Sequence, residues 1–336
     1  MGKKIAIGIG IIFCIVGGVI LYVQWNRVRE VIVSPISEEI KPIPTPSISI
    51  MPLDRYTVIN LGKRTASPSA MIKDEILLQE LTHTSYRFSF ISENKKVTGM
   101  LNIPNGTGPF PVIVMFRGYV DREQYKTGIG TERAAGFFAK KGFITVAPDF
   151  LGYGESDMPS ENVIEERFQT YIVAIDMLGS ISTIEEADAT KVGIWVHSNG
   201  GQIALTVLEA LEQPYPTILW APVSKPFPYS ILYYTDEATD RGKLIRRALA
   251  EFEKDYDVDL YAITDYFDRI RAPIQLHQGS ADDAVPQKWS DELAEALKKN
   301  EVDVEYFVYP NADHNLMPSW NIVVARDIQF YKKYLR

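Results

Sequence analysis

The chain has 336 residues, of which 46% are hydrophobic and 23% charged, and its formal net charge is -8. This length accommodates one large α/β domain with additional segments. The acidic balance argues against nucleic-acid binding, which requires clustered Lys and Arg. A single cysteine, Cys14, excludes an intramolecular disulfide, and no Cys/His cluster has the spacing of a zinc site. We therefore expect neither a metal nor another cofactor.

Residues 5–23 carry no charge and are long enough to cross a hydrocarbon core of about 30 Å. Basic and aromatic residues flank this run: Lys3, Lys4, Trp25, Arg27 and Arg29. The pattern predicts a single-pass transmembrane anchor within residues 1–25. A cleaved signal peptide is the alternative, which the missing small-residue cleavage site disfavours. The short N-terminal end favours an extracytoplasmic body, although the flanking charges almost balance.

Residues 26–53 are predicted to be a spacer, because residues 34–52 contain five Pro and four Ser without periodicity. Residues 54–336 are predicted to form the catalytic domain. Two alternating stretches at 86–91 and 96–103 favour a β-hairpin near its start.

Continuous apolar runs, typical of buried parallel strands, alternate with helical patterns through the rest of the domain. The predicted strands are residues 112–116, 143–147, 192–196, 217–220, 274–277 and 304–308. The predicted helices are residues 131–141, 161–180, 200–212, 288–299 and 319–334. The alternation predicts an α/β fold with a mostly parallel sheet covered on both faces. Residues 223–271 are too long for a plain connection, and we expect them to form a helical cap over the carboxyl edge.

The third parallel strand runs into Val196-His197-Ser198-Asn199-Gly200, and a helix begins at once. A nucleophilic serine on a G-x-S-x-G elbow requires this strand–turn–helix context. Val196 replaces the first glycine, so a neighbouring void is expected to accommodate it. The alternative role for Ser198 is an N-cap of the following helix.

A serine nucleophile needs a base and an orienting acid, which follow it along the chain in this type of site. Asp282 follows the fifth predicted strand and His314 follows the sixth, so these residues are predicted as acid and base. Asp283 is the alternative acid. The other histidines are predicted to be structural: His83 in the lead-in, His197 pointing away into packing, and His277 in the core with a hydrogen-bond partner.

An oxyanion hole requires preorganised N–H donors. We expect one from the backbone of Asn199, the residue after the nucleophile. The second is expected from the backbone of Tyr119, in the loop after the first parallel strand.

From about residue 84 onward, the sequence resembles α/β-hydrolases, especially the catalytic domain of the prolyl oligopeptidase family and related esterases. The matching segments are Arg117-Gly118-Tyr119, the D-x-x-G-x-G-x-S stretch 149–156, residues 189–201, residues 279–286 and Asp313-His314. The resemblance implies an α/β-hydrolase fold with Ser198, Asp282 and His314 as catalytic triad. Arg117 stands where members of this family commonly have a His, in the loop after the first parallel strand. The lead-in is also too short for the β-propeller of large oligopeptidases, which leaves room for an esterase.

Three functions remain open. The favoured one is a membrane-anchored, carboxylesterase-like serine hydrolase that acts on a small ester through an acyl-enzyme. The second is a serine peptidase of the prolyl oligopeptidase type acting on short peptides. Charged side chains that could hold a peptide terminus are Asp121, Arg122, Glu123, Glu237, Asp240 and Arg241. The third is a catalytically inactive binding protein, which the complete triad disfavours. No feature assigns an oligomeric state.

Overall fold

The computed structural model describes residues 51–65 and 68–335, apart from the side chain of Glu237. The predicted anchor at 5–23 and nearly all of the predicted spacer lie outside these residues. Within the described ranges, no helix is both long and apolar enough to cross a membrane. The transmembrane anchor therefore stays a prediction from the sequence.

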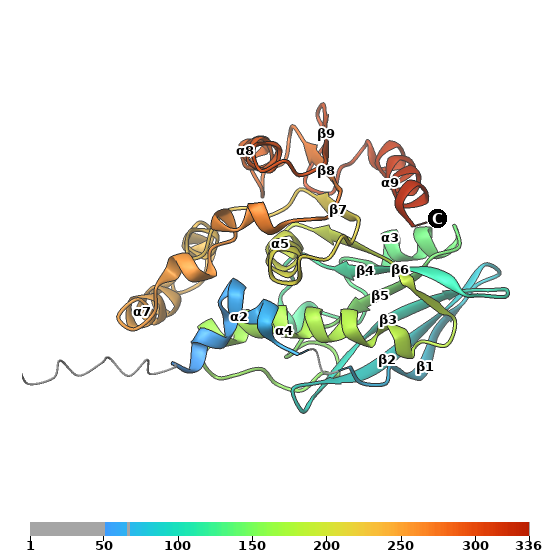
Figure 1. Ribbon diagram of the computed structural model, residues 1–336, viewed down its shortest axis with the longest axis horizontal. Helices are drawn as coiled ribbons and strands as arrows, with labels where there is room; N and C mark the ends of the chain where they lie inside the picture. Colours follow the sequence, from blue (N-terminus) through green and yellow to red (C-terminus); the bar gives the residue numbers. More distant parts are fainter. Residues whose placement is uncertain (1–50, 66–67, 336) are drawn as a thin grey trace, which may run out of the picture. The chain divides into compact units, whose positions relative to one another are not determined.

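In the described part of the chain, nine strands form one sheet in the order β1-β2-β3-β5-β4-β6-β7-β8-β9 (Figure 1). The first three strands pair antiparallel, β3 also pairs antiparallel with β5, and all strands from β5 to β9 pair in parallel. The bounds are β1 Ile72–Gln79, β2 His83–Ser92, β3 Lys95–Pro104, β4 Phe110–Phe116, β5 Ile144–Pro148, β6 Ala187–His197, β7 Thr217–Trp220, β8 Ile274–Gly279 and β9 Val304–Tyr309. The mostly parallel sheet predicted from the apolar runs is confirmed.

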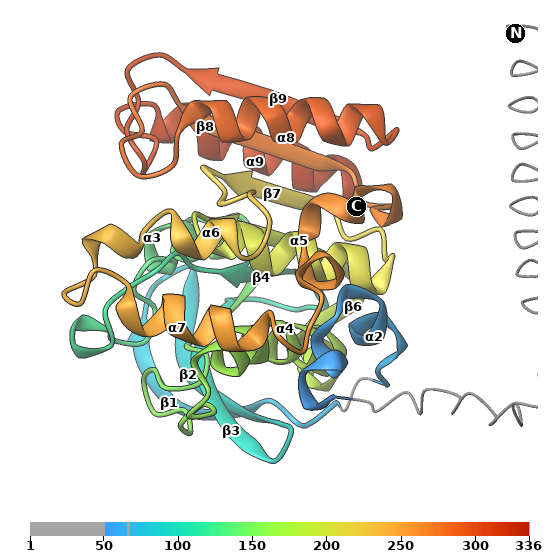
Figure 2. The same cartoon turned by 90° about the vertical axis from the view of Figure 1, so that its left-hand side faces the viewer.

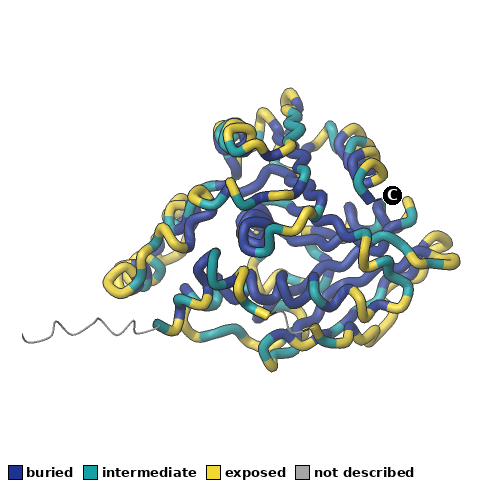
Figure 3. The backbone as a smooth tube through the Cα atoms, in the orientation of Figure 1, coloured by how far each residue is buried: buried dark blue, intermediate teal, exposed yellow. Residues whose placement is uncertain are grey.

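Helices cover both faces of this sheet because its strands are apolar on both sides. In β4, Val112 and Val114 point into one core and Ile113 and Met115 into the other. The first core is closed mainly by α2 (Val58–Lys63), α4 (Val163–Ser180), α5 (Gly200–Leu211) and α8 (Gln287–Lys299). The second is closed by α3 (Glu132–Ala139) and α9 (Trp320–Tyr334). The continuous burial of the central strands is visible in Figure 3.

The segment expected to form a cap, residues 223–271, folds into short helices, including α6 (Tyr229–Leu232) and α7 (Lys243–Phe252) (Figure 2). Aromatic rings attach its second half to α4. The ring of Phe168 lies 5.0 Å from that of Tyr261 and 6.0 Å from that of Phe252, measured between centroids. These contacts fix the end of α7 against the body, and residues around the start of α7 line a cavity described below.

Candidate active site

Ser198 follows the last residue of β6 and occupies the left-handed region of the backbone map, with φ 54°. A non-glycine residue in this region typically costs about 1–3 kcal/mol and requires support from its surroundings. The N–H of Ser198 donates to the carbonyl of Trp220 at 3.0 Å. Its own carbonyl accepts from Gly201 at 2.9 Å and Val223 at 2.8 Å. The turn is thus held on both sides at the carboxyl edge of the sheet, as a serine elbow requires.

Two glycines allow the backbone to close around Ser198. A Cβ at Gly200 would overlap the carbonyl oxygen of Phe116, and a Cβ at Gly118 would lie 3.0 Å from the Cβ of Ser198. Val196 lies within β6 as a fully buried core residue, and the void expected beside it stays a prediction. The tight approach occurs at Gly200, the first residue of α5.

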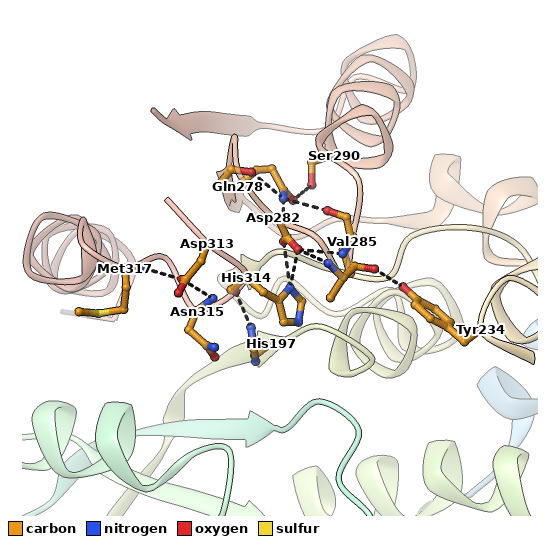
Figure 4. A network of polar contacts seen from close by, with 12 residues as sticks. His197, Tyr234, Gln278, Asp282, Val285, Ser290, Asp313, His314, Asn315 and Met317 are labelled. Carbon is orange, nitrogen blue, oxygen red and sulfur yellow. Dashed lines mark hydrogen bonds and ion pairs between the residues drawn. The ribbon is translucent and has the colours of Figure 1, made fainter. Parts of the chain in front are cut away.

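Asp282 and His314 form a hydrogen-bonded pair beside this turn (Figure 4). Nδ1 of His314 lies 2.9 and 3.0 Å from the two carboxylate oxygens of Asp282. The same carboxylate accepts N–H groups from Ala284 at 2.9 Å and Val285 at 2.8 Å, and the Gln278 amide at 2.9 Å. Burial opposes ionisation of Asp282, but the hydrogen bonds from His314, Val285 and Gln278 outweigh it and lower its pKa. Asp282 is therefore a fixed anion that orients the imidazole.

Asp283, the alternative acid, is exposed and has no hydrogen bond within the described residues. Ser290 donates to the side-chain oxygen of Gln278 at 2.7 Å, and Gln278 in turn donates to the Asp282 carboxylate. These two hydrogen bonds hold the loop of Asp282 in place. The loop after His314 is held by Asp313, whose carboxylate accepts the N–H groups of Asn315 at 2.9 Å and Met317 at 2.8 Å (Figure 4). The structure thus brings Asp282 to His314 and leaves Asp283 at the surface.

His197 points toward His314, so the prediction that it turns away from the site is wrong. Its Nε2 lies 2.9 Å from the His314 carbonyl oxygen, and the two rings are 4.5 Å apart (Figure 4). A carbonyl oxygen only accepts hydrogen bonds, so Nε2 carries the proton. Burial and the neighbouring His314 lower the pKa of His197 to about 4. A neutral His197 therefore connects the serine turn to the backbone of the predicted base.

His277 is fully buried. Its ring nitrogens lie 2.8 Å from the Tyr309 hydroxyl and 3.0 Å from the Gln275 side-chain oxygen, which confirms it as a core residue with partners. His83 is buried in β2. Among the described residues, no group of three or more His, Cys, Asp or Glu side chains could hold a metal ion.

The two predicted oxyanion donors belong to Tyr119, which follows Gly118, and Asn199, which follows Ser198, and Gly118 and Ser198 approach each other closely. Neither the Asn199 N–H nor the Tyr119 N–H donates to another group in the described ranges. Tyr119 is 75% exposed, and its hydroxyl donates to Asp121 at 2.8 Å. Both backbone donors are consequently free to bind a substrate oxygen.

Arg117 braces this loop, a role that sequence analysis did not assign. Its guanidinium donates to the carbonyls of Gly118 at 2.9 Å and Asp149 at 3.0 Å. It also lies 4.1 Å from the ring centroid of Tyr153 and 4.5 Å from that of Tyr125. The arginine that replaces the usual histidine thus ties the loop after β4 to the loop after β5.

A cavity of about 640 Å³ opens beside the serine turn. Residues 117–119, the N-terminal halves of α4 and α5, and residues 235–245 contribute to its wall. Of the charged residues proposed to hold a peptide terminus, Asp240 lines it, and its carboxylate accepts the N–H groups of Gly242 and Leu244. Arg122 pairs with Glu166, and Asp121 is bonded to Tyr119. Glu123 and Arg241 are exposed and do not line the cavity.

Comparisons with known proteins identify the family of the chain. The model of the prolyl oligopeptidase family matches residues 131–336. An uncharacterized peptidase of Bacillus subtilis, YtmA, is 24% identical over 253 residues, which cover 74% of this chain and 93% of that protein. Acetyl xylan esterase 1 from Thermoanaerobacterium sp. has a similar fold, with a TM-score of 0.60, 17% identity and coverage of 84% of this chain and 94% of that one. An acylaminoacyl peptidase from Pyrococcus horikoshii gives a TM-score of 0.58 at 17% identity, covering 76% of this chain and 42% of that one. The family model spans more than half of the chain, which therefore belongs to the prolyl oligopeptidase family and is a serine hydrolase of the α/β-hydrolase superfamily.

Proposed function

We propose that the chain is a carboxylesterase-like enzyme with Ser198 as nucleophile, His314 as base and Asp282 as orienting acid. The hydrogen bond from His314 Nδ1 to the buried Asp282 carboxylate carries this proposal. It fixes the tautomer in which Nε2 is the unprotonated nitrogen. Within the described residues, Nε2 has no hydrogen-bond partner, so it is available to accept a proton.

The proposed reaction proceeds in two halves. Ser198 Oγ attacks the ester carbonyl carbon while its proton moves to His314 Nε2, and the carbonyl oxygen becomes an oxyanion held by the N–H groups of Asn199 and Tyr119. The carbon–oxygen bond to the leaving alcohol then breaks, and the alcohol takes the proton from Nε2. Water repeats the sequence on the acyl-enzyme, with His314 as base, and releases the acid and free Ser198.

The extent of the domain argues against a large oligopeptidase with a separate propeller. The residues before α3 contribute β1 to β4 to the same sheet as the site, and the described residues contain no separate propeller. The match to the acetyl xylan esterase covers 94% of that chain, whereas the match to the acylaminoacyl peptidase covers 42%. This chain therefore shares nearly the full extent of the esterase and less than half of that peptidase, whereas 93% of the B. subtilis peptidase YtmA is covered.

A short-peptide hydrolase is the second candidate. The family model and the B. subtilis relative both bear the name of a peptidase. The same triad chemistry cleaves amides, with the amine as leaving group.

The decisive experiment measures kcat/KM of the full-length chain for p-nitrophenyl acetate and butyrate and for aminoacyl and dipeptidyl p-nitroanilides. We expect ester turnover to dominate, and Ser198→Ala to abolish it while the melting temperature is retained. Substantial anilide turnover with negligible ester turnover would replace the esterase proposal with the peptidase. Unchanged ester turnover in Ser198→Ala would reject the mechanism. Folded wild-type protein that a fluorophosphonate fails to label would instead indicate an inactive binding protein.

We also propose that residues 5–23 anchor the enzyme in a membrane, with the catalytic domain on the extracytoplasmic side. The uncharged run and its basic and aromatic flanks support the anchor. Flotation with lipid vesicles should recover the full-length chain in the lipid fraction and leave a chain without residues 1–30 in the soluble fraction. In intact cells, a protease added outside should degrade the domain. Equal partitioning of both chains would contradict the anchor, and complete protection would contradict the orientation.

A further inference from the structure

Arg167 places an unpaired positive charge at the cavity beside the serine turn. It lies in the second turn of α4, and its side chain lines the cavity. Its Nη2 donates to the side-chain oxygen of Asn199 at 3.1 Å. No carboxylate forms an ion pair with it among the described residues, because the adjacent Glu166 pairs with Arg122 instead. An unpaired, partly buried guanidinium is costly, so its position calls for a ligand.

The other charged residues of the cavity wall already have partners. Arg117 donates to two backbone carbonyls and packs against tyrosine rings. Glu166 pairs with Arg122, and Asp240 accepts two backbone N–H groups. Much of the remaining wall is apolar, including Phe150, Leu151, Val163, Ile203 and Ile245. The described wall therefore combines an aliphatic and aromatic lining with the Arg167 guanidinium, for which one hydrogen bond, to Asn199, is seen, which suits a ligand with an apolar chain and an anionic end.

The position of the cavity indicates which part of a substrate enters it. Gly118, Tyr119 and Asn199 contribute to its wall, whereas His314 and Asp282 do not. In the proposed mechanism the leaving group must lie within reach of His314, which protonates it. The acyl portion, whose carbonyl oxygen binds the N–H groups of Asn199 and Tyr119, is then the part that extends into the cavity.

We propose that the enzyme acts on substrates whose acyl portion carries a carboxylate, and that this carboxylate pairs with Arg167. The inference rests on the proposed serine mechanism. A guanidinium has five N–H donors in a planar fork, and one of them is engaged by Asn199. The others can bind a carboxylate while Asn199 stays in place. The cavity volume is within the usual range for small-molecule sites and accommodates an acyl chain of several carbons.

The first test compares two p-nitrophenyl esters that differ only in the end of the acyl chain, the monoester of adipic acid and the hexanoate. For the full-length wild type, the ratio of their kcat/KM values should exceed that of Arg167→Gln about 10- to 100-fold, as expected for a charge-assisted hydrogen bond. Arg167→Lys should retain part of this preference. Lys191→Gln removes a remote positive charge on β6 and should keep the wild-type ratio.

The ratio separates anion binding from a positioning role. If Arg167 acts only by holding Asn199, its removal slows both esters equally and the unchanged ratio overturns the proposal. A second comparison uses 4-acetoxybenzoate and phenyl acetate, in which the charge lies on the leaving group. We expect Arg167→Gln to leave that ratio unchanged. A selective loss for 4-acetoxybenzoate would overturn the assignment to the acyl portion.

A binding measurement makes the result independent of catalysis. Calorimetry of full-length Ser198→Ala with monomethyl adipate and methyl hexanoate should show at least tenfold tighter binding of the anionic ester. Adding Arg167→Gln should remove this difference. Equal affinity for both esters in Ser198→Ala would overturn the carboxylate proposal even where the serine mechanism holds. Conversely, full ester turnover by Ser198→Ala would refute the serine mechanism. The calorimetry would then still show whether Arg167 binds the carboxylate.

Discussion

His197 makes the stability of the folded protein depend on pH. Its pKa is about 4 in the folded protein against 6.5 for an ordinary histidine, because burial and the nearby His314 disfavour the imidazolium. Between these values the unfolded chain binds a proton that the folded chain does not. The free energy of unfolding therefore rises with pH across this window and is lost as the pH falls toward 4.

The magnitude follows from the size of the difference. A change of one in a pKa corresponds to about 1.4 kcal/mol, so the full effect of His197 is about 3 kcal/mol. About 2 kcal/mol of this develops between pH 7 and pH 4.5. His197→Gln removes the titrating group and retains an N–H donor for the His314 carbonyl. We expect the variant to lose about 2 kcal/mol less than the wild type over this interval.

Urea unfolding of both proteins at several pH values, followed by circular dichroism, measures this difference. His83→Gln is the control, because burial also lowers the pKa of His83, in β2. It should weaken the pH dependence in the same direction and leave kcat unchanged. Equal losses of stability for the wild type and His197→Gln between pH 7 and pH 4.5 would refute the reasoning.

Four further substitutions test the site and the core. Asp282→Asn should reduce kcat by about 10⁴, whereas Asp283→Asn should keep wild-type kcat; the reverse result would exchange their roles. Gly118→Ala places a methyl group 3.0 Å from the Ser198 Cβ and should lower kcat/KM for p-nitrophenyl butyrate without changing the melting temperature. Glu209 is fully buried with both carboxylate oxygens unpartnered, and burial raises its pKa. As the pH rises above the pKa of this glutamate in the unfolded chain, the unfolded state ionises more readily than the folded state, and the folded protein loses stability. Glu209→Met should therefore add about 1–3 kcal/mol of stability at pH 8 and less at pH 5. A pH-independent gain in urea unfolding would contradict this explanation.

The sequence predicts the central sheet well because each parallel strand is a short, continuous apolar run, a local feature. The predicted strand 217–220 matches β7, and 274–277 lies within β8. The sequence did not predict a separate strand at β1. Its residues Ile72–Gln79 are all exposed and lack alternation, and two register shifts interrupt its pairing with β2. Backbone pairing to a neighbour, rather than burial, makes this segment a strand.

The site shows a similar division. The order of Ser198, Asp282 and His314 can be read along the chain because this fold places all three after strand ends. The direction of His197 could not be predicted, since it depends on a contact with a loop more than a hundred residues later. Arg167 did offer a local signal. It stands on the same helical face as the buried Ile164 and Tyr171, and a cation on an apolar face usually has a specific partner.

The charge of Arg167 also bears on the choice between esterase and peptidase. A dipeptidyl peptidase releases the N-terminal part of a peptide, so its acyl portion carries a free ammonium group. In the geometry proposed here, that ammonium would enter the cavity that Arg167 lines, and like charges in a partly desolvated site repel strongly. The Asp240 carboxylate lines the same cavity and accepts one N–H group at each oxygen, which leaves it acceptor capacity to offset part of this repulsion. An ester with an anionic acyl chain meets no repulsion from Arg167, and a peptide avoids that repulsion where its N-terminus is blocked.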